Sequence, residues 1–133
     1  HQWVLDLIAS DDYDSHRNAD RLHDVWQLNG KRIISEKAVA EMTKVQTGEI
    51  KTGFVDGMSF GYGFAVVREP KGVTAMLSPG TYGHGGAFGT QAWIDPTQDV
   101  FVVLLIQRSN LANGDASPMR QALQELAVEA IKK

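Results

Sequence analysis

The chain has 133 residues, 43% of them hydrophobic and 22% charged, and its formal net charge is −3. This composition is typical of one globular domain, and the scattered charges form no basic stripe, which argues against a nucleic-acid partner. The sequence contains no cysteine, which excludes a disulfide framework, thiol catalysis and cysteine zinc sites. We expect a single domain over residues 1–133.

The sequence leaves the compartment open. The longest apolar run, residues 100–106, is far too short to cross a membrane, and no signal peptide is visible. The chain begins with His1 rather than Met, which indicates a trimmed, processed or excised sequence. We therefore expect no membrane partner and assign no compartment.

The first thirty residues carry weak patterns. Ser15 is a candidate N-cap for a helix that runs through Leu22 and Trp26 and ends at Asn29-Gly30. On that helix His16 and His23 would share a face with Asp20, which is a conceivable metal site, although a solvated polar face is far more common. We expect neither a metal nor a cofactor.

From residue 31 the pattern is clearer. Ser35 is an N-cap candidate for a short helix over residues 36–43, and the glycines of residues 45–60 indicate a loop. The predicted strands are residues 60–68, 73–78, 88–95 and 100–106. A turn at Pro70-Lys71-Gly72 joins the first two strands, and the uninterrupted apolar run of the last predicts burial on both faces.

The last element is a helix. Ser117 caps it, and Pro118 occupies the first turn, where its missing N–H is tolerated. The predicted apolar stripe consists of Met119, Leu123, Leu126, Ala130 and Ile131. The fold class is therefore α+β: an antiparallel sheet of about three to four strands, covered by a C-terminal helix and preceded by one or two N-terminal helices.

Candidate chemistry is concentrated between residues 82 and 90, where several glycines surround His84. Gly85 and Gly86 lack Cβ atoms, so another group can approach the backbone closely. A polar side chain beside exposed amides at a strand end can hold an anion or a polarised carbonyl. A glycine-rich turn with a histidine bonded to its neighbours explains the same pattern equally well.

Residues 61–108 resemble the C-terminal part of serine β-lactamase-related hydrolases, which include class C-like β-lactamases, D-alanyl-D-alanine peptidases and family VIII carboxylesterases. The matching pieces are Gly61-Tyr62-Gly63-Phe64, His84-Gly85-Gly86-Ala87-Phe88-Gly89-Thr90, Trp93-Ile94-Asp95-Pro96 and Val102-Val103-Leu104-Leu105-Ile106-Gln107. With weaker matches upstream, the resemblance covers roughly residues 28–133. It implies a part of a β-lactamase-like fold.

In that family His84-Gly85-Gly86 resembles the third motif, which is usually Lys-Thr-Gly. The resemblance implies that His84 positions a substrate carboxylate or ester oxygen, or tunes a proton relay. It also implies that the backbone N–H of Ala87 is an oxyanion-hole donor, and that Tyr82, Gly85 and Gly86 line the substrate.

The family's nucleophile, a serine in a Ser-x-x-Lys pattern, is missing, because no serine has a lysine three residues later. The second motif, Tyr-x-Asn or Ser-x-Asn, is also missing, and residues 1–27 match the family poorly. The resemblance therefore implies the C-terminal portion of an enzyme that opens an ester, amide or β-lactam, inactive alone. Its partners would be that small-molecule substrate and a missing N-terminal half, and many relatives are exported bacterial proteins.

The alternative is a non-catalytic module that associates with itself as a homo-oligomer. A sheet without its parental neighbours exposes an apolar face and strand edges, and both favour self-association.

Overall fold

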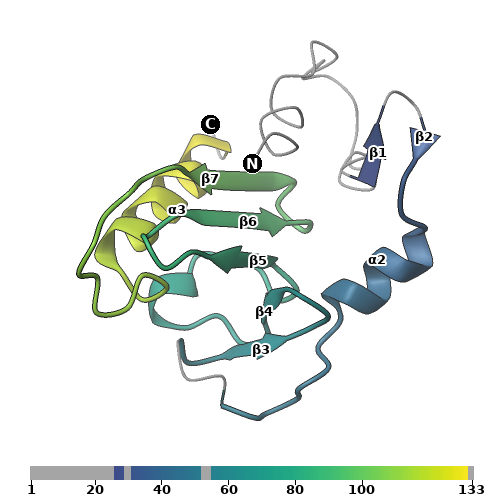
Figure 1. The fold of residues 1–133 in the computed structure, drawn as a ribbon, viewed down its shortest axis with the longest axis horizontal. Coiled ribbons are helices and arrows are strands. Elements are labelled where there is room, and N and C mark those ends of the chain that lie inside the picture. The colour runs from purple at the N-terminus through teal and green to yellow at the C-terminus, as the bar shows by residue number, and fades with distance from the viewer. Residues whose placement is uncertain (1–25, 29–30, 52–54, 132–133) are drawn as a thin grey trace. The chain divides into compact units, whose positions relative to one another are not determined.

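The computed structural model describes residues 26–28, 31–51 and 55–131 (Figure 1). The chain divides into two compact units, residues 1–36 and residues 37–133, and each is described by itself. Within the described residues no helix is both long and apolar enough to span a membrane.

The first unit contains a pair of short strands. β1 (Gln27–Leu28) and β2 (Lys31–Arg32) pair antiparallel, and the N–H of Ile33 donates to the carbonyl of Trp26 at 2.8 Å. The predicted helix does not continue to residue 28, because Asn-Gly between two short extended runs is a strong hairpin sequence. The rest of that predicted helix lies outside the described residues.

The second unit begins with helix α2 (Glu36–Thr43), which confirms the predicted helix over residues 36–43. The hydroxyl of Thr43 donates to the carbonyl of Val39 at 3.0 Å and closes its last turn. The carbonyl of Met42 then accepts from the N–H of Tyr62 at 2.9 Å, which ties the end of α2 to the loop after the first strand of the sheet.

A five-stranded antiparallel sheet forms the centre of this unit (Figure 1), which confirms the predicted α+β class with one strand more than expected. Its order follows the chain, β3-β4-β5-β6-β7, so that every neighbour is the next strand along the sequence. The strands are β3 (Met58–Phe60), β4 (Ala65–Val67), β5 (Tyr82–Gly85), β6 (Gln91–Asp95) and β7 (Val100–Leu104).

Three segments differ from the prediction. β3 lies inside the predicted loop of residues 45–60, and β5 lies outside every predicted strand. The predicted strand over residues 73–78 is wrong, since a 3-10 helix, η2 (Gly72–Thr74), and turns occupy it. The hydroxyl of Thr74 donates to the carbonyl of Lys71 at 2.9 Å and accepts from its N–H at 3.1 Å. Such local bonds satisfy backbone groups that a strand would leave to a ladder.

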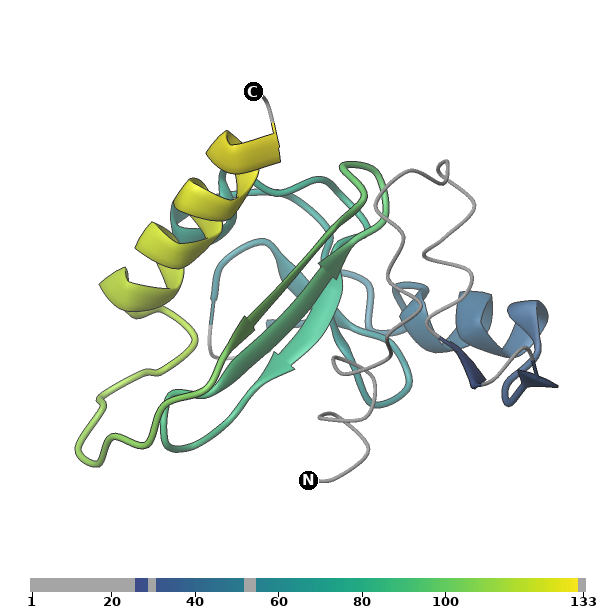
Figure 2. The same ribbon diagram turned by 90° about the horizontal axis from the view of Figure 1, so that it is seen from above.

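Helix α3 (Pro118–Ile131) covers one face of the sheet (Figure 2), and the hydroxyl of Ser117 caps it by accepting from the N–H of Arg120 at 3.3 Å. The core between helix and sheet contains Met58, Ala65, Val67, Leu77, Trp93 and Val128. The predicted apolar stripe of α3 is wrong, because Leu126 is 65% exposed and Ile131 is 47% exposed. The buried residues of α3 are Arg120, Gln124 and Val128, which lie four apart on one row.

β7 differs from its prediction in burial. Val102 and Trp93 belong to the core, but Phe101 is 49% exposed and Leu105 is 62% exposed, so burial on both faces is wrong. Within the described residues β7 pairs only with β6, and its outer side is an edge of the sheet.

Candidate functional site

Strand β5 presents a different surface on each of its two faces. Tyr82 and His84 point to one face and Gly83 and Gly85 to the other, because side chains alternate along a strand. Tyr82 is buried, and its ring packs edge-on against Phe64 with centroids 5.4 Å apart. His84 is exposed, so it is the polar side chain that β5 offers to a ligand.

The imidazole of His84 has two close neighbours. Its Nδ1 lies 2.6 Å from the carbonyl oxygen of Gly85. Its ring packs edge-on against that of Phe60, with centroids 6.0 Å apart and an interplanar angle of 66°. These contacts hold the ring beside β5, and its Nε2 forms no hydrogen bond with the described residues.

The other face of β5 is filled, which explains its glycines. A Cβ on Gly83 would collide with the carbonyl of Ala92 and would lie 2.9 Å from the Cε3 atom of Trp93. A Cβ on Gly85 would collide with the carboxylate of Asp115. Only glycine permits these approaches, so the strand is pressed against the core and directs His84 away from it.

A tight turn follows β5 and carries the second predicted site residue. The N–H of Gly86 donates to the carbonyl of Thr90 at 2.7 Å, and the N–H of Gly89 donates back to the carbonyl of Gly86 at 2.9 Å. Ala87 lies between them and is exposed, and within the described ranges no acceptor takes its N–H. Gly86 is also exposed, so the turn presents a backbone amide within three residues of His84.

A polar network supports β5 from the helix side. The indole of Trp93 donates to the side-chain oxygen of Gln91 at 2.7 Å, and the amide of Gln91 donates to the carboxylate of Asp115 at 3.2 Å. Arg120 donates to the backbone carbonyl of Asp115 at 2.8 Å and stacks over Trp93, with its Cζ atom 3.8 Å from the ring centroid. The sequence analysis did not predict this network. Its one sign in the sequence is that the polar residues Gln91 and Arg120 stand where a strand and a helix face the core.

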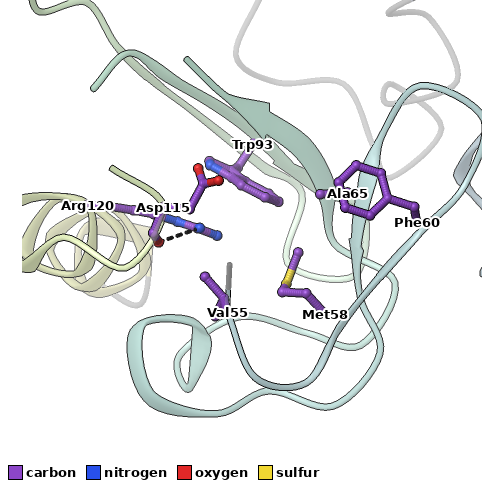
Figure 3. Close-up of a pocket in the computed structure, with 7 residues that line it drawn as sticks. All are labelled: Val55, Met58, Phe60, Ala65, Trp93, Asp115 and Arg120. Carbon is purple, nitrogen blue, oxygen red and sulfur yellow. Dashed lines mark hydrogen bonds between the residues drawn. The ribbon is translucent and has the colours of Figure 1, made fainter. Parts of the chain in front are cut away.

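Arg120 is 1% exposed, and burial lowers its pKa to about 10, while Asp115 opposes that shift. The guanidinium therefore stays charged at neutral pH. A small hollow beside it is lined by Val55, Met58, Phe60, Ala65, Trp93, Asp115 and Arg120 (Figure 3). It lies on the helix side of the sheet, and its lining contains no serine, threonine, lysine or histidine, so we place the candidate site at His84 instead.

Asp95 joins two segments that lead into the site. It is 1% exposed. Its carboxylate accepts from the N–H groups of Thr97 and Gln98 at 3.0 Å, from the N–H of Ser78 at 2.8 Å and from the side chain of Gln98 at 2.7 Å. Burial alone would raise the pKa of Asp95, but these hydrogen bonds outweigh it and hold the pKa below its ordinary value.

Within the described residues no group of three or more histidine, cysteine, aspartate or glutamate side chains is arranged to hold a metal ion. The candidate metal residues His16, Asp20 and His23 lie outside that part of the chain.

Three comparisons relate this architecture to known proteins. A family model described as Beta-lactamase matches residues 11–126, which is most of the chain. Among solved structures, a β-lactamase from Mycobacterium bovis superposes with a TM-score of 0.61 at 23% sequence identity, over 76% of this chain. The chain spans 39% of the length of that protein. No curated protein matches.

Proposed function

Because the chain belongs to the β-lactamase family, we propose that it is the C-terminal portion of a serine hydrolase whose parent opens an ester, amide or β-lactam. In the parent the serine oxygen would bond to the substrate carbonyl carbon, and the alcohol or amine would leave with a proton. Water would then release the acid and restore the serine.

This proposal rests on the difference between the two faces of β5, one exposed and one packed against the core. His84 is exposed on one face, the Ala87 amide is exposed just beyond it, and the other face is packed against Asp115 and Trp93. A rigid strand with an outward polar side chain and an unused N–H is what an oxyanion hole requires. One such donor contributes about 3 kcal/mol of transition-state stabilisation.

The nucleophile belongs to the missing half in this proposal. Every serine of the chain lacks a lysine three residues later, so none has the family's pattern for activation. Gly86 is exposed and would let the substrate approach the backbone, whereas the missing side chain of Gly85 faces Asp115. Tyr82 supports the strand from its buried position.

Intact-mass measurement after incubation with a fluorophosphonate, a penicillin and an activated ester tests the absence of a nucleophile. We expect no adduct from the folded chain. A covalent adduct would mean that a serine of this chain is activated, and the division into two halves would be wrong.

A chimera tests the positive role of the segment. Residues 61–133 would replace the segment of the Mycobacterium bovis β-lactamase with which they align. Within that chimera Ala87→Pro removes the N–H donor and should lower kcat for a chromogenic ester or lactam roughly 100-fold or more. Ala87→Ser keeps the N–H and is the matched control. Equal loss in both variants of a folded chimera would contradict the oxyanion role.

A second candidate is a non-catalytic module that associates with itself. The exposed Phe101 and Leu105, together with the edge of β7, favour it. Sedimentation velocity distinguishes the two: a monomer at all concentrations argues against self-association, whereas a dimer supports it.

A further inference from the structure

A neutral His84 has one ring N–H, and that N–H donates to the backbone carbonyl of Gly85. Its Nδ1 lies 2.6 Å from the carbonyl oxygen of Gly85, and a carbonyl oxygen can only accept. Nδ1 must therefore carry the hydrogen, which leaves a lone pair on Nε2. In this form His84 offers its ligand an acceptor and no donor.

The neighbours of His84 on the other strands carry no charge. From β3 it meets the ring of Phe60, and its register partner on β6 is Ala92; neither side chain titrates. Within the described residues no ion pair includes His84. The carboxylate of Asp115 lies against Gly85 on the opposite face of the strand. The Gly85 carbonyl is therefore the polar group that sets the orientation of the ring.

The position of the Gly85 carbonyl is set by the fold. Gly85 pairs with Gln91 across β5 and β6, and the side chain of Gln91 donates to the Asp115 carboxylate at 3.2 Å. The same carboxylate fills the space beneath Gly85. Because strand pairing and this contact hold Gly85 from both sides, the bond to His84 is anchored in the sheet.

We propose that this bond fixes His84 in its Nδ1–H tautomer, so that the site selects a neutral substrate bearing a hydroxyl or amide N–H donor rather than a carboxylate. This inference rests on the proposed function, since it names the substrate class of the same site. A carboxylate would face the Nε2 lone pair, whereas a hydroxyl or N–H completes a hydrogen bond with it. An ammonium group at this position would instead bind a carboxylate, because it only donates hydrogen bonds and carries a positive charge.

Long-range nitrogen–proton NMR on the labelled chain tests the tautomer directly. At pH 8 the His84 ring should show a pyrrole-type Nδ1 and a pyridine-type Nε2. His84→Gln identifies the signals by their loss. An Nε2–H pattern, or an average of the two tautomers, would overturn the inference.

A matched pair of ligands tests the substrate class. Benzyl alcohol and benzoate share a phenyl ring and differ in the group they present. At pH 8 benzyl alcohol should shift the Nε2 resonance at about ten-fold lower concentration than benzoate, because it alone donates.

In His84→Gln the ring signal is gone, so the backbone amide resonances of residues 84–87 are followed instead. They should respond to the two probes at similar concentrations, because the glutamine amide both donates and accepts. Equal or stronger binding of benzoate at pH 8 would overturn the inference, as would a response to neither probe. These measurements need no turnover. An inactive chimera in which His84 still shows the Nδ1–H tautomer would therefore contradict the proposed function but not the fixed tautomer.

Discussion

At the scale of single residues, Asp95 and Asp99 stand at the two ends of one turn and behave in opposite ways. Asp99 is exposed and has a φ of 51°, which aspartate tolerates better than most residues. Asp95 is buried and accepts four hydrogen bonds, of which the one from Ser78 holds the segment before β5 against the end of β6. Its contribution is therefore structural, and it reaches the site only through the position of β5.

Replacing the carboxylate should expose this contribution. Asp95→Asn puts an NH2 group against backbone donors and should cost about 2 kcal/mol of unfolding free energy at pH 7. The pKa of Asp95 is lowered by folding, so its stabilisation is present above the ordinary value of about 3.9 and is lost as pH falls through the folded pKa.

Urea unfolding at pH 7 and at pH 3 measures both effects. The difference between wild type and Asp95→Asn should shrink at pH 3. Asp99→Asn, on the same turn, should change stability by less than about 0.5 kcal/mol at either pH. A constant Asp95→Asn deficit between the two pH values would show that ionisation is not its cause.

At the scale of elements, β5 depends on close contact with β6. Gly83→Ala places a methyl group against the backbone of Ala92 and Trp93, which cannot move without breaking the pairing. We expect a loss of at least about 2 kcal/mol in urea unfolding.

Gly86→Ala is the matched control for that substitution. A Cβ there meets Thr90 at 3.4 Å, an ordinary contact distance, so the loss should stay near 0.5 kcal/mol. If both substitutions cost the same, the close approach of β5 to β6 is not what requires glycine at position 83.

The elements predictable from sequence were those with local causes. Helix α2, the Ser117 cap of α3 and the β-prone runs of β6 and β7 follow from capping residues and β-branched content. The burial of Arg120 and Gln124 could not be predicted, because it depends on Trp93 and Val73, which are distant in sequence. The strand prediction over residues 73–78 was wrong for a different reason, since Thr74 bonds locally to the backbone of Lys71.

The candidate site was predicted in part. The glycine cluster around His84 marked the segment, and the exposed positions of His84 and Ala87 suit their expected roles, which stay predictions. The pairing of His84 with the Gly85 carbonyl could not be read from the sequence, because it depends on a side-chain torsion. Whether Tyr82 lines a substrate also stays a prediction; its ring is buried against Phe64.

At the scale of the whole molecule, the edge of β7 is the surface most prone to association. Its five residues carry no charge, and natural edge strands are commonly protected by lysine or proline. Phe101→Lys should therefore weaken any dimer at least about ten-fold by placing a charge at the edge.

Sedimentation velocity over a range of concentrations measures this effect. Ile50→Lys adds the same charge at an exposed residue near β3, the opposite edge of the sheet, and should leave association unchanged. If both variants dissociate equally, net charge rather than the β7 edge controls association.

The alternation along β5 has a consequence for how this fold can change over generations. Positions 83 and 85 admit no side chain, whereas position 84, between them, faces outward and is bounded by little more than the ring of Phe60. A new residue at position 84 can alter what the site recognises at small cost to folding, because it leaves the sealed face untouched. A substitution at position 84 can therefore change substrate recognition without any change in the core, although the core contacts are made by positions 83 and 85 on the same strand.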